Sequence, residues 1–390
     1  MQIEGRRWDT GQAVRLSLDG QRIGRVDALE IPTDDAAHLP WLCPPLVDIQ
    51  FNGWGGQEFG AADLTAQKVA RIVDVLAGQG VGRICPTVTT ASDEVMRHAA
   101  RTISEACEQF PRVARAVLAI HQEGPYLSPE DGPRGAHPRQ HCRPPDWDHF
   151  QRLQEAAGGR IRLLTLAPEW DGAAEFITRA TASGVIVSLG HTAAHSEQIR
   201  AAVDAGARLS THLGNGAHGT LRRHPNYLWD QMAEDRLWAS LIVDGHHLPP
   251  AVVKSLVRAK TPERCLLVSD ASGMAGLPPG RYATSLCELE ILSSGKIVLA
   301  GQEQLLAGAS APLGTGVANV MRYAGVDLAT AMAMAVQRPL ELFSLPEPRL
   351  AEGELADLVL FDLPGADGGG PLGEWSIRET WIAGQQVYRA

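Results

Sequence analysis

The feature that most constrains the fold is the alternation of short apolar runs with amphipathic helical stretches between residues 44 and 345. Such an alternation is typical of repeated βα units, which build a parallel sheet. Eight runs are expected to be strands: Val47–Asn52, Arg83–Pro86, Ala116–Glu123, Ile161–Glu169, Val185–His191, Leu209–His212, Ala239–Asp244 and Leu266–Asp270. The pattern therefore predicts an α/β fold, a (β/α)8 TIM barrel, whose usual length of roughly 250 residues suits this span.

Two helices can be placed from their own signals. After Leu64, apolar residues recur at helical spacing until Gly78 and Gly80, which are expected to end the helix. A second helix is expected to begin after Ser92, whose hydroxyl suits an N-cap and which is followed by two acidic residues. Both helices fall where the barrel pattern needs them.

The two ends of the chain have a different pattern, with short β-rich pieces broken by Gly and Asp. Because chain termini often lie close together, we expect residues 1–43 and 346–390 to join into one small β-sandwich domain beside a barrel of residues 44–345. The length of 390 residues, with 44% hydrophobic and 21% charged residues, supplies enough apolar material for a large core.

Charge and cysteine content limit the partners. Lys and Arg total 35 against 45 Asp and Glu, a net charge of −10, and no basic run is present, so nucleic acid is not expected as a partner. The six cysteines are scattered without a C-x-x-C pair, which favours reduced thiols and a cytoplasmic protein. No apolar run is long enough to cross a membrane, so no membrane association is expected.

Polar groups follow several of the expected strands, at the point where each strand ends. In a barrel these ends meet on one rim, which is where catalytic residues lie. Glu123, His191 and His212 would supply two imidazoles and a carboxylate, a common shell for catalytic zinc. A metal held there would acidify a water molecule and polarise a carbonyl, and Asp270, after the last strand, is the candidate base.

Each of these residues taken alone has a plainer explanation. An isolated histidine in a buried strand is more often a hydrogen-bonded core residue, and an aspartate after a strand more often caps a helix. Four such residues on four correctly ordered strands favour the metal site. The remaining histidines lack this context: His195 is expected near a helix start, His218 and His224 in a loop, and His38, His98, His141 and His149 on the surface.

The sequence resembles the N-acetylglucosamine-6-phosphate deacetylase family of the amidohydrolase superfamily. The resemblance runs in order along nearly the whole chain and is carried by stretches that follow the expected strands: Leu46–Gly56, His121–Leu127, Leu166–Glu169, Ser188–Thr192, Thr211–Gly216, Val243–His247, Val268–Ala271 and Leu306–Ser310. No single stretch is decisive, but their joint order is highly specific.

The resemblance implies one divalent metal per subunit on Glu123, His191 and His212, zinc first, with iron, manganese or cobalt as alternatives, and Asp270 as the acid and base. Gln50 and Asn52 stand where many amidohydrolases bind a second metal; because amides are poor zinc ligands, that second position is expected to be lost. For the substrate the resemblance implies these contacts: Ala136, His137, Asn215, Gly216, Arg223, His247, Leu306, Ala307, Gly308 and Ala309.

Arg223 and His247 are the implied phosphate ligands, although the neighbouring Arg222 leaves the assignment open by one residue. The loop from His218 to Trp229 is more basic and aromatic than the family pattern, and His246 replaces a more usual aliphatic residue. These departures bear on the sugar and its phosphate more than on hydrolysis.

The expected function is therefore metal-dependent deacetylation of N-acetylglucosamine 6-phosphate, which releases acetate and a free amine, in a cytoplasmic homodimer of amino-sugar metabolism. Two alternatives stay open. One is a related amidohydrolase that deacylates another N-acetylhexosamine or N-acyl substrate. The other is an inactive barrel that binds sugar phosphates, which the complete Glu, His, His and Asp set disfavours because buried polar groups are costly to keep.

Overall fold

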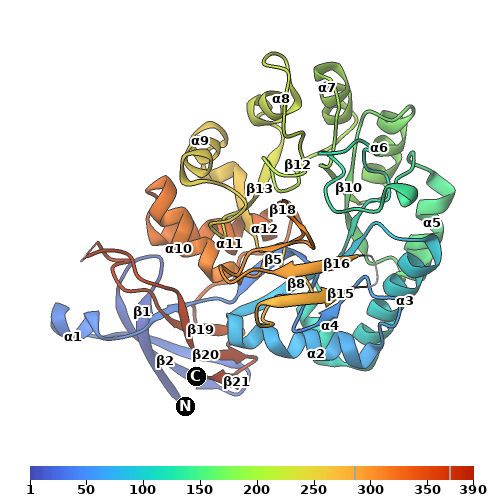
Figure 1. Ribbon diagram of the computed structural model, residues 1–390. Helices are drawn as coiled ribbons and strands as arrows, with labels where there is room; N and C mark the ends of the chain where they lie inside the picture. Colours follow the sequence, from blue (N-terminus) through green and yellow to red (C-terminus); the bar gives the residue numbers. More distant parts are fainter. Residues whose placement is uncertain (285–286, 369) are drawn as a thin grey trace.

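A computed structural model describes residues 1–284, 287–368 and 370–390. The polypeptide forms a βα barrel, a terminal β domain beside it and a small antiparallel sheet that crosses the barrel (Figure 1). No helix in the described part of the chain is long and apolar enough to cross a membrane.

The barrel contains eight parallel strands in the order β14-β13-β12-β11-β10-β9-β8-β5. It closes between the first and last of these, where the Asp270 N–H donates to the Gln50 carbonyl at 2.9 Å and the Asn52 N–H to the Ala271 carbonyl at 3.0 Å. The predicted TIM barrel is confirmed. Its strands are β5 (Leu46–Phe51), β8 (Val81–Thr89), β9 (Ile120–Glu123), β10 (Ile161–Leu166), β11 (Ile186–Leu189), β12 (Leu209–Ser210), β13 (Trp238–Ile242) and β14 (Cys265–Val268).

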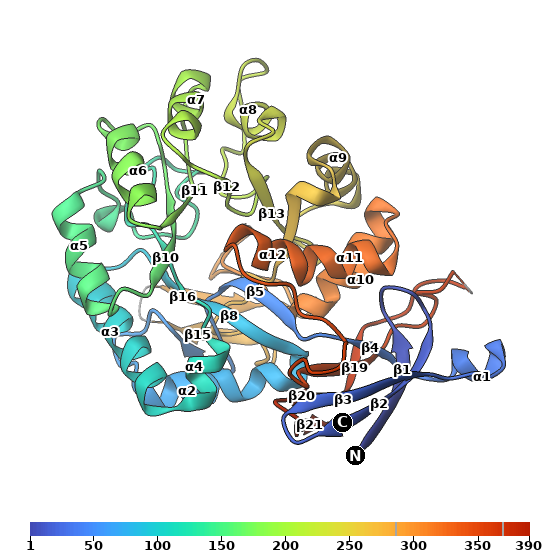
Figure 2. The ribbon, with the colours of Figure 1, turned by 180° about the vertical axis from the view of Figure 1, so that it is seen from behind.

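Helices surround the strands (Figures 1 and 2). Both helices placed from the sequence are present: Ser92 caps its helix through a bond from the Val95 N–H, and Gly80 adopts φ +70° just after the first helix and a 3-10 turn. The helices are α2 (Ala66–Leu76), α3 (Asp93–Gln109), α4 (Pro111–Ala116), α5 (Trp147–Ala156), α6 (Ala173–Ala182), α7 (Ser196–Asp204), α8 (Tyr227–Ala233), α9 (Pro250–Lys260), α10 (Leu313–Ala324), α11 (Leu328–Ala335) and α12 (Gln337–Leu342).

Most barrel strands end earlier than the sequence pattern predicted. β9 also begins later, because Ala116 belongs to α4 rather than to the strand. His191, His212 and Asp270 lie beyond their strands at φ +51°, +31° and +50°. Residues with a side chain rarely adopt this left-handed region, and a strand cannot continue through it. These three residues therefore stand on the turns that follow their strands.

The two terminal segments form one seven-stranded sheet, in the order β21-β20-β19-β4-β1-β2-β3. Its strands are β1 (Gln2–Arg7), β2 (Ala13–Asp19), β3 (Arg22–Ala28), β4 (Trp41–Cys43), β19 (Leu358–Asp362), β20 (Ser376–Ile382) and β21 (Gln385–Arg389). The sheet folds over on itself, since the Ile23 N–H donates to the Glu354 carbonyl at 2.9 Å. Figure 2 shows both termini side by side, and a small β domain built from both ends is confirmed.

A second antiparallel sheet, β15 (Gly280–Ala283), β16 (Glu288–Ile291), β17 (Ile297–Leu299) and β18 (Gln302–Leu306), follows the last barrel strand and was not predicted. Its strands are three to five residues long, and β15 and β18 are largely exposed, so they lack the longer apolar runs that revealed the barrel. The remaining elements are short: α1 (Thr33–Ala37), β6 (Gly53–Trp54), β7 (Gln57–Glu58), η1 (Ala77–Gln79), η2 (Arg139–His141) and η3 (Pro262–Arg264).

Candidate active site

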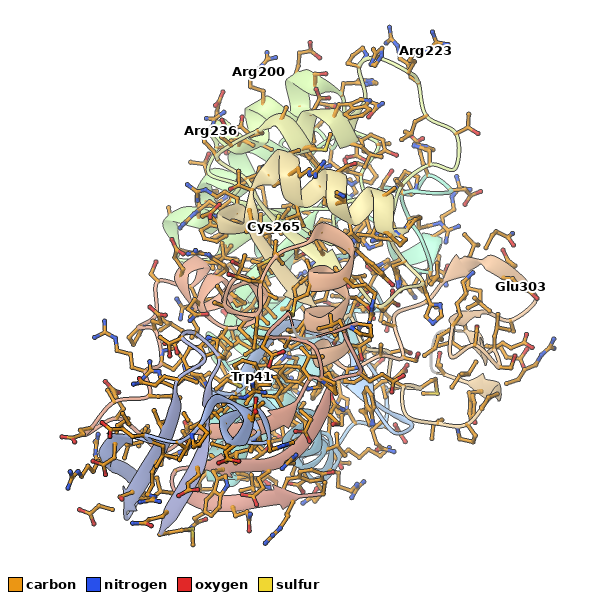
Figure 3. The ribbon with its side chains drawn as sticks, turned by 90° about the vertical axis from the view of Figure 1, so that its left-hand side faces the viewer. Trp41, Arg200, Arg223, Arg236, Cys265 and Glu303 are labelled. Carbon is orange, nitrogen blue, oxygen red and sulfur yellow. The ribbon has the colours of Figure 1, made fainter. Side chains whose placement is uncertain are left out.

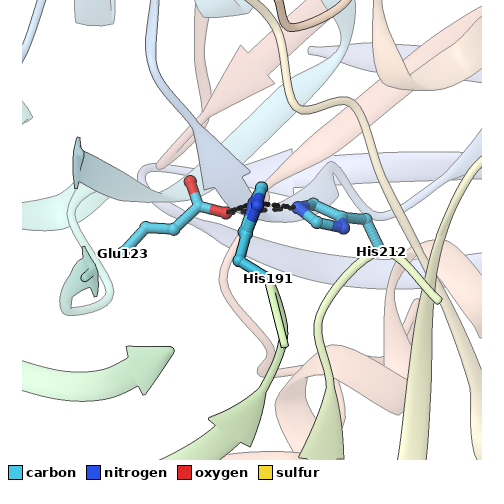
Figure 4. A group of neighbouring side chains, drawn as sticks. All are labelled: Glu123, His191 and His212. Carbon is cyan, nitrogen blue, oxygen red and sulfur yellow. Dashed lines mark hydrogen bonds and ion pairs between the residues drawn. The ribbon is translucent and has the colours of Figure 1, made fainter. Parts of the chain in front are cut away.

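Three side chains from the ends of different barrel strands converge at the rim (Figure 4). Glu123 Oε1 lies 3.3 Å from His191 Nε2 and 3.2 Å from His212 Nε2, and the two imidazole nitrogens lie 3.0 Å apart. All three side chains are buried. One ligand atom from each lies within 4.8 Å of the others, which is the spacing of a metal shell.

Local contacts hold the His191 ring in place. Its Nδ1 bonds to the Pro133 carbonyl at 2.7 Å, which leaves Nε2 directed toward Glu123. Glycines line one side of the ring: a Cβ on Gly216 would stand 2.8 Å from His191 Nδ1, and one on Gly135 would stand 3.2 Å from Cε1. A hydrogen bond from the other ring nitrogen, here to the Pro133 carbonyl, fixes the tautomer and the direction of a metal-binding histidine.

The electrostatics of the cluster suit a cation. Burial alone would raise the pKa of Glu123, but hydrogen bonds from His191 and His212, with their charges, outweigh burial and hold this pKa well below its ordinary value. The ionised carboxylate and two imidazoles form the donor set that divalent zinc and related metals prefer. The residues present therefore fit a metal ion.

Asp270 lines the same cavity. It follows β14, whose neighbours around the barrel are β13 and β5. Burial and the negative charge of Glu123 raise the pKa of Asp270 to about 7. Asn52 Nδ2 donates to Asp270 Oδ1 at 2.7 Å. A carboxyl group with a pKa near neutrality can both accept and return a proton, as a general base and acid must.

Gln50 and Asn52, placed by sequence at the lost second-metal position, both donate to acidic side chains. Gln50 Nε2 donates to Glu123 Oε1 at 2.9 Å, while Asn52 holds Asp270. Both amides thus stabilise a negative charge of the site through an N–H bond.

A cavity of about 360 Å³ opens over this cluster. Most of the substrate residues expected from the sequence line it: Ala136, His137, Asn215, Gly216, His247, Leu306, Ala307 and Gly308. Ala309 is buried behind the wall, where its N–H donates to the Asp270 carbonyl at 2.8 Å. The expected substrate residues are therefore gathered in one place, with Arg223 as the main exception.

Arg223 is exposed near the tip of the loop before α8 and is not among the described residues that line the cavity (Figure 3). No lysine or arginine is among those lining residues, which include five histidines: His137, His191, His212, His218 and His247. His247 Nδ1 lies 2.8 Å from Asp244 Oδ2. Burial would raise the pKa of Asp244, but the hydrogen bonds and charge of His247 lower it to about 2.

Two other histidines have contacts that the sequence did not predict. The surface position expected for His149 is wrong: its side chain is 1% exposed and bonds to the Tyr126 hydroxyl at 2.8 Å and to Asp93 at 3.0 Å. The helical pattern of α5 should have placed it on the buried face. His218 does lie in a loop, as expected, and it also lines the cavity and bonds to Glu130 at 3.2 Å.

Sequence reasoning missed part of the cavity wall. Glu58, at the end of β7, and residues of the unpredicted sheet line it, including Cys287, Leu289 and Gln304. The available signal for Glu58 was its place in the loop directly after the first barrel strand, since such loops form the rim. The signals of the sheet were short: the alternation of Leu289, Glu290 and Ile291, and the apolar run Ile297–Leu299.

A closed eight-stranded barrel with a Glu, His, His and Asp cluster at its C-terminal rim defines a metal-dependent hydrolase of the amidohydrolase type. No protein-family model matches the chain. Relatives in sequence and solved structures do match it.

The chain is 32% identical to N-acetylgalactosamine-6-phosphate deacetylase from Escherichia coli O157:H7, covering 88% of this chain and 87% of the relative. It is 32% identical to N-acetylglucosamine-6-phosphate deacetylase from Bos taurus, covering 89% and 83%. The structure of N-acetyl-D-glucosamine-6-phosphate deacetylase from Mycobacterium smegmatis in complex with N-acetyl-D-glucosamine-6-phosphate matches with a TM-score of 0.86 at 27% identity, over 99% of both chains. The chain belongs to the family of N-acetylhexosamine-6-phosphate deacetylases.

Proposed function

We propose that this enzyme hydrolyses the acetamido group of N-acetylglucosamine 6-phosphate to acetate and glucosamine 6-phosphate. The observation that carries the proposal is the joint position of Glu123, His191, His212 and Asp270 in one cavity of a chain from this family. The reaction adds water across the C–N bond, so the site needs a base for the water and an acid for the departing nitrogen.

Glu123, His191 and His212 would hold one divalent metal ion, zinc first, with iron, manganese or cobalt as alternatives. Bound there, the ion would supply Lewis-acid polarisation of the acetyl carbonyl and acidify a water molecule. Asp270 would take a proton from that water and pass it to the nitrogen as the C–N bond breaks. Asn52 directs Asp270, and Gln50 holds Glu123, through the bonds described above.

The substrate residues are proposed from their place in the cavity wall. His137, whose pKa is lowered to about 3 by burial and by the charge of His191, is a neutral imidazole that suits an uncharged acetamido or hydroxyl group. Asn215 and Gly216 lie beside the metal cluster, and Leu306, Ala307 and Gly308 close the side formed by the small sheet, with Ala309 behind them. His247 would bind the phosphate.

We further propose a cytoplasmic homodimer in which Arg223, exposed on its own chain, contributes to the phosphate site of the partner subunit. The support is the absence of Lys and Arg from the described lining of the cavity, beside an exposed loop that carries Arg222 and Arg223. Arginine suits a phosphate best, because its planar guanidinium can bind two phosphate oxygens at once.

The epimer N-acetylgalactosamine 6-phosphate is the second candidate substrate, because the Escherichia coli relative is named for it at the same identity as the Bos taurus one. The two sugars differ only in the orientation of one ring hydroxyl, so the catalytic groups serve both equally.

An acetate-release assay tests the proposal. The protein, freed of metal by a chelator and then supplied with Zn²⁺, Fe²⁺, Mn²⁺ or Co²⁺, is offered the 6-phosphates of N-acetylglucosamine, N-acetylgalactosamine and N-acetylmannosamine, with unphosphorylated N-acetylglucosamine as control. We expect metal-dependent release from N-acetylglucosamine 6-phosphate and far less from the unphosphorylated sugar. Absence of acetate from every sugar with every metal would support the inactive sugar-phosphate-binding barrel instead.

A further inference from the structure

Glu58 is an acidic side chain of the cavity wall that the proposed reaction does not use. It ends β7, in the loop that follows the first barrel strand, and lines the same cavity as Asp270. The β6–β7 hairpin packs along the segment after β14: the Gly55 N–H donates to the Ala275 carbonyl and the Gly56 N–H to the Gly273 carbonyl, both at 2.8 Å. These backbone bonds hold the hairpin that carries Glu58 against the rim of the barrel.

The side chain of Glu58 occupies space that a side chain at residue 273 would otherwise fill. A Cβ on Gly273 would stand 1.9 Å from Glu58 Cγ, so the absence of a side chain at residue 273 lets the glutamate pass across it. Cys287, from the small sheet, lines the same cavity. The glutamate therefore packs across Gly273 and faces the cavity, part of whose wall is the small sheet.

The carboxylate of Glu58 has no hydrogen-bond or ion-pair partner among the described residues, in contrast to Glu123 and Asp270. Burial raises the pKa of Glu58 to about 7, with no partner to oppose it. Holding a carboxylate in a partly buried position without donors is costly. The group is thus ready to accept hydrogen bonds from a molecule that enters the cavity.

The charge of Glu58 decides which part of the substrate it faces. A phosphate would be repelled, and the acetamido group is required at Asp270 and the metal cluster. In strand order His247 follows β13, Asp270 follows β14 and Glu58 follows β5, so Asp270 stands between the other two. C2 lies across the ring from C5, which carries the phosphate-bearing C6. A hexose with its C2 group at Asp270 and its phosphate toward His247 therefore turns one ring edge toward Glu58, either C1 with the ring oxygen or C3 with C4.

We propose that Glu58 is a specificity-determining residue that accepts hydrogen bonds from the adjacent C3 and C4 hydroxyls of the hexosamine ring. A carboxylate offers two oxygens and so matches a pair of neighbouring O–H donors. The C3–C4 edge has such a pair, whereas the C1 edge has a single hydroxyl beside the ring oxygen. The inference rests on the proposed function for the identity of the sugar.

The test compares wild type with Glu58→Ala and Glu58→Gln on N-acetylglucosamine 6-phosphate and its 3-deoxy and 4-deoxy analogues. Glu303→Ala is the matched control, because this exposed glutamate lies on β18 of the small sheet and outside the described cavity lining (Figure 3). We expect Glu58→Ala to lower kcat/KM for the full substrate roughly 10- to 100-fold, mainly through KM, and Glu58→Gln to lower it less. Metal content and thermal midpoint should stay at wild-type values.

The decisive result is the coupling between the residue and the hydroxyls. Deleting either hydroxyl should lower kcat/KM of the wild type about as much as the mutation does, and should lower that of Glu58→Ala little further, as in a double-mutant cycle. An equal loss by Glu58→Ala on all three sugars, or no loss at all, would overturn the proposal.

Calorimetry with glucosamine 6-phosphate and its 3-deoxy and 4-deoxy analogues repeats the comparison without turnover. Coupling seen in binding but without any acetate release would uphold the role of Glu58 and contradict the proposed function. Acetate release without coupling in either measurement would uphold the proposed function and contradict the role of Glu58.

Discussion

Several residues at the site adopt backbone angles or buried positions that are unfavourable for their residue type. His191, His212 and Asp270 all adopt positive φ, and Asp270 and Glu123 are acidic groups in a buried cluster. Each of the three positive φ angles costs free energy of the order of 1–3 kcal/mol. Such costs gathered at one rim are typical of a site that is held ready for chemistry.

Asp270→Asn should abolish turnover because asparagine cannot accept a proton from water at this position. We expect kcat to fall at least about 10³-fold with bound metal unchanged, measured by acetate release and elemental analysis. Asp235→Asn, at an exposed aspartate, is the control. Activity of Asp270→Asn near that of the wild type would remove Asp270 from the role proposed here.

Asp48 should make stability depend on pH. It is fully buried on β5, Oδ1 accepts from the Gln50 and Ser269 N–H groups, and Oδ2 has no partner among the described residues. Burial raises the pKa of Asp48 to about 7, above its unfolded value of about 3.9. Between these values the folded protein binds more protons, so stability from this group is complete below the unfolded pKa and is lost as pH rises through about 7.

The measurement is the denaturant midpoint of wild type and Asp48→Asn between pH 4 and pH 8. We expect the free energy of unfolding of the wild type, relative to the variant, to fall by a few kcal/mol over this range. Other titrating groups cancel in the difference. A difference that does not change with pH would mean that Asp48 keeps an ordinary pKa in the fold.

At the scale of elements, the ends of neighbouring strands determine how the metal ligands meet. β10, β11 and β12 run side by side and lead to the turns that carry His191 and His212. Thr165 and Thr211 join these strands through a bond of 2.8 Å between their hydroxyls, directly beside Gly190. The spacing of these strands therefore sets the spacing of the ligands.

Gly190→Ala should disturb this spacing. Its Cβ would stand 2.7 Å from Thr211 Cβ and 3.1 Å from Thr165 Cγ2, so a strand end must move. We expect a loss of about 1–3 kcal/mol in stability and at least about tenfold weaker metal binding, measured by denaturation and by competition with a chelator. Gly219→Ala, whose Cβ would meet no atom within 4 Å, should change neither. Unchanged metal affinity in Gly190→Ala would show that the turn absorbs the shift.

At the scale of the whole molecule, the proposed dimer predicts complementation between two defective chains. Arg223→Ala should mainly raise KM for the phosphorylated sugar, and Asp270→Asn should be inactive. Co-expression should restore about a quarter of wild-type activity at low substrate, because half of randomly formed dimers are mixed and each has one complete site. Light scattering should give twice the chain mass of 41.8 kDa. Activity no greater than that of Arg223→Ala alone at equal dose would contradict a shared site.

The barrel was predictable because each βα unit has a local signal: an apolar strand, a helical period and a turn. Ser92 and Gly80 show that even helix ends were readable. The small sheet of β15–β18 was not predicted, since strands of three to five residues separated by turns are too short to stand out from a loop. His149 is a different case: the helical pattern of α5 could have shown its burial, and only its bonds to Tyr126 and Asp93 depend on other elements.

The sequence by itself determined the fold class, the family and the residues that converge at the rim, because strand order and strand ends follow from local pattern. Only the tertiary structure decided which atoms meet: that Gln50 and Asn52 donate to Glu123 and Asp270, that Arg223 is exposed on its own chain, and that Glu58 lines the cavity without a hydrogen-bond partner among the residues that the structure describes. Contacts of this kind join residues far apart in sequence, so no local pattern specifies them.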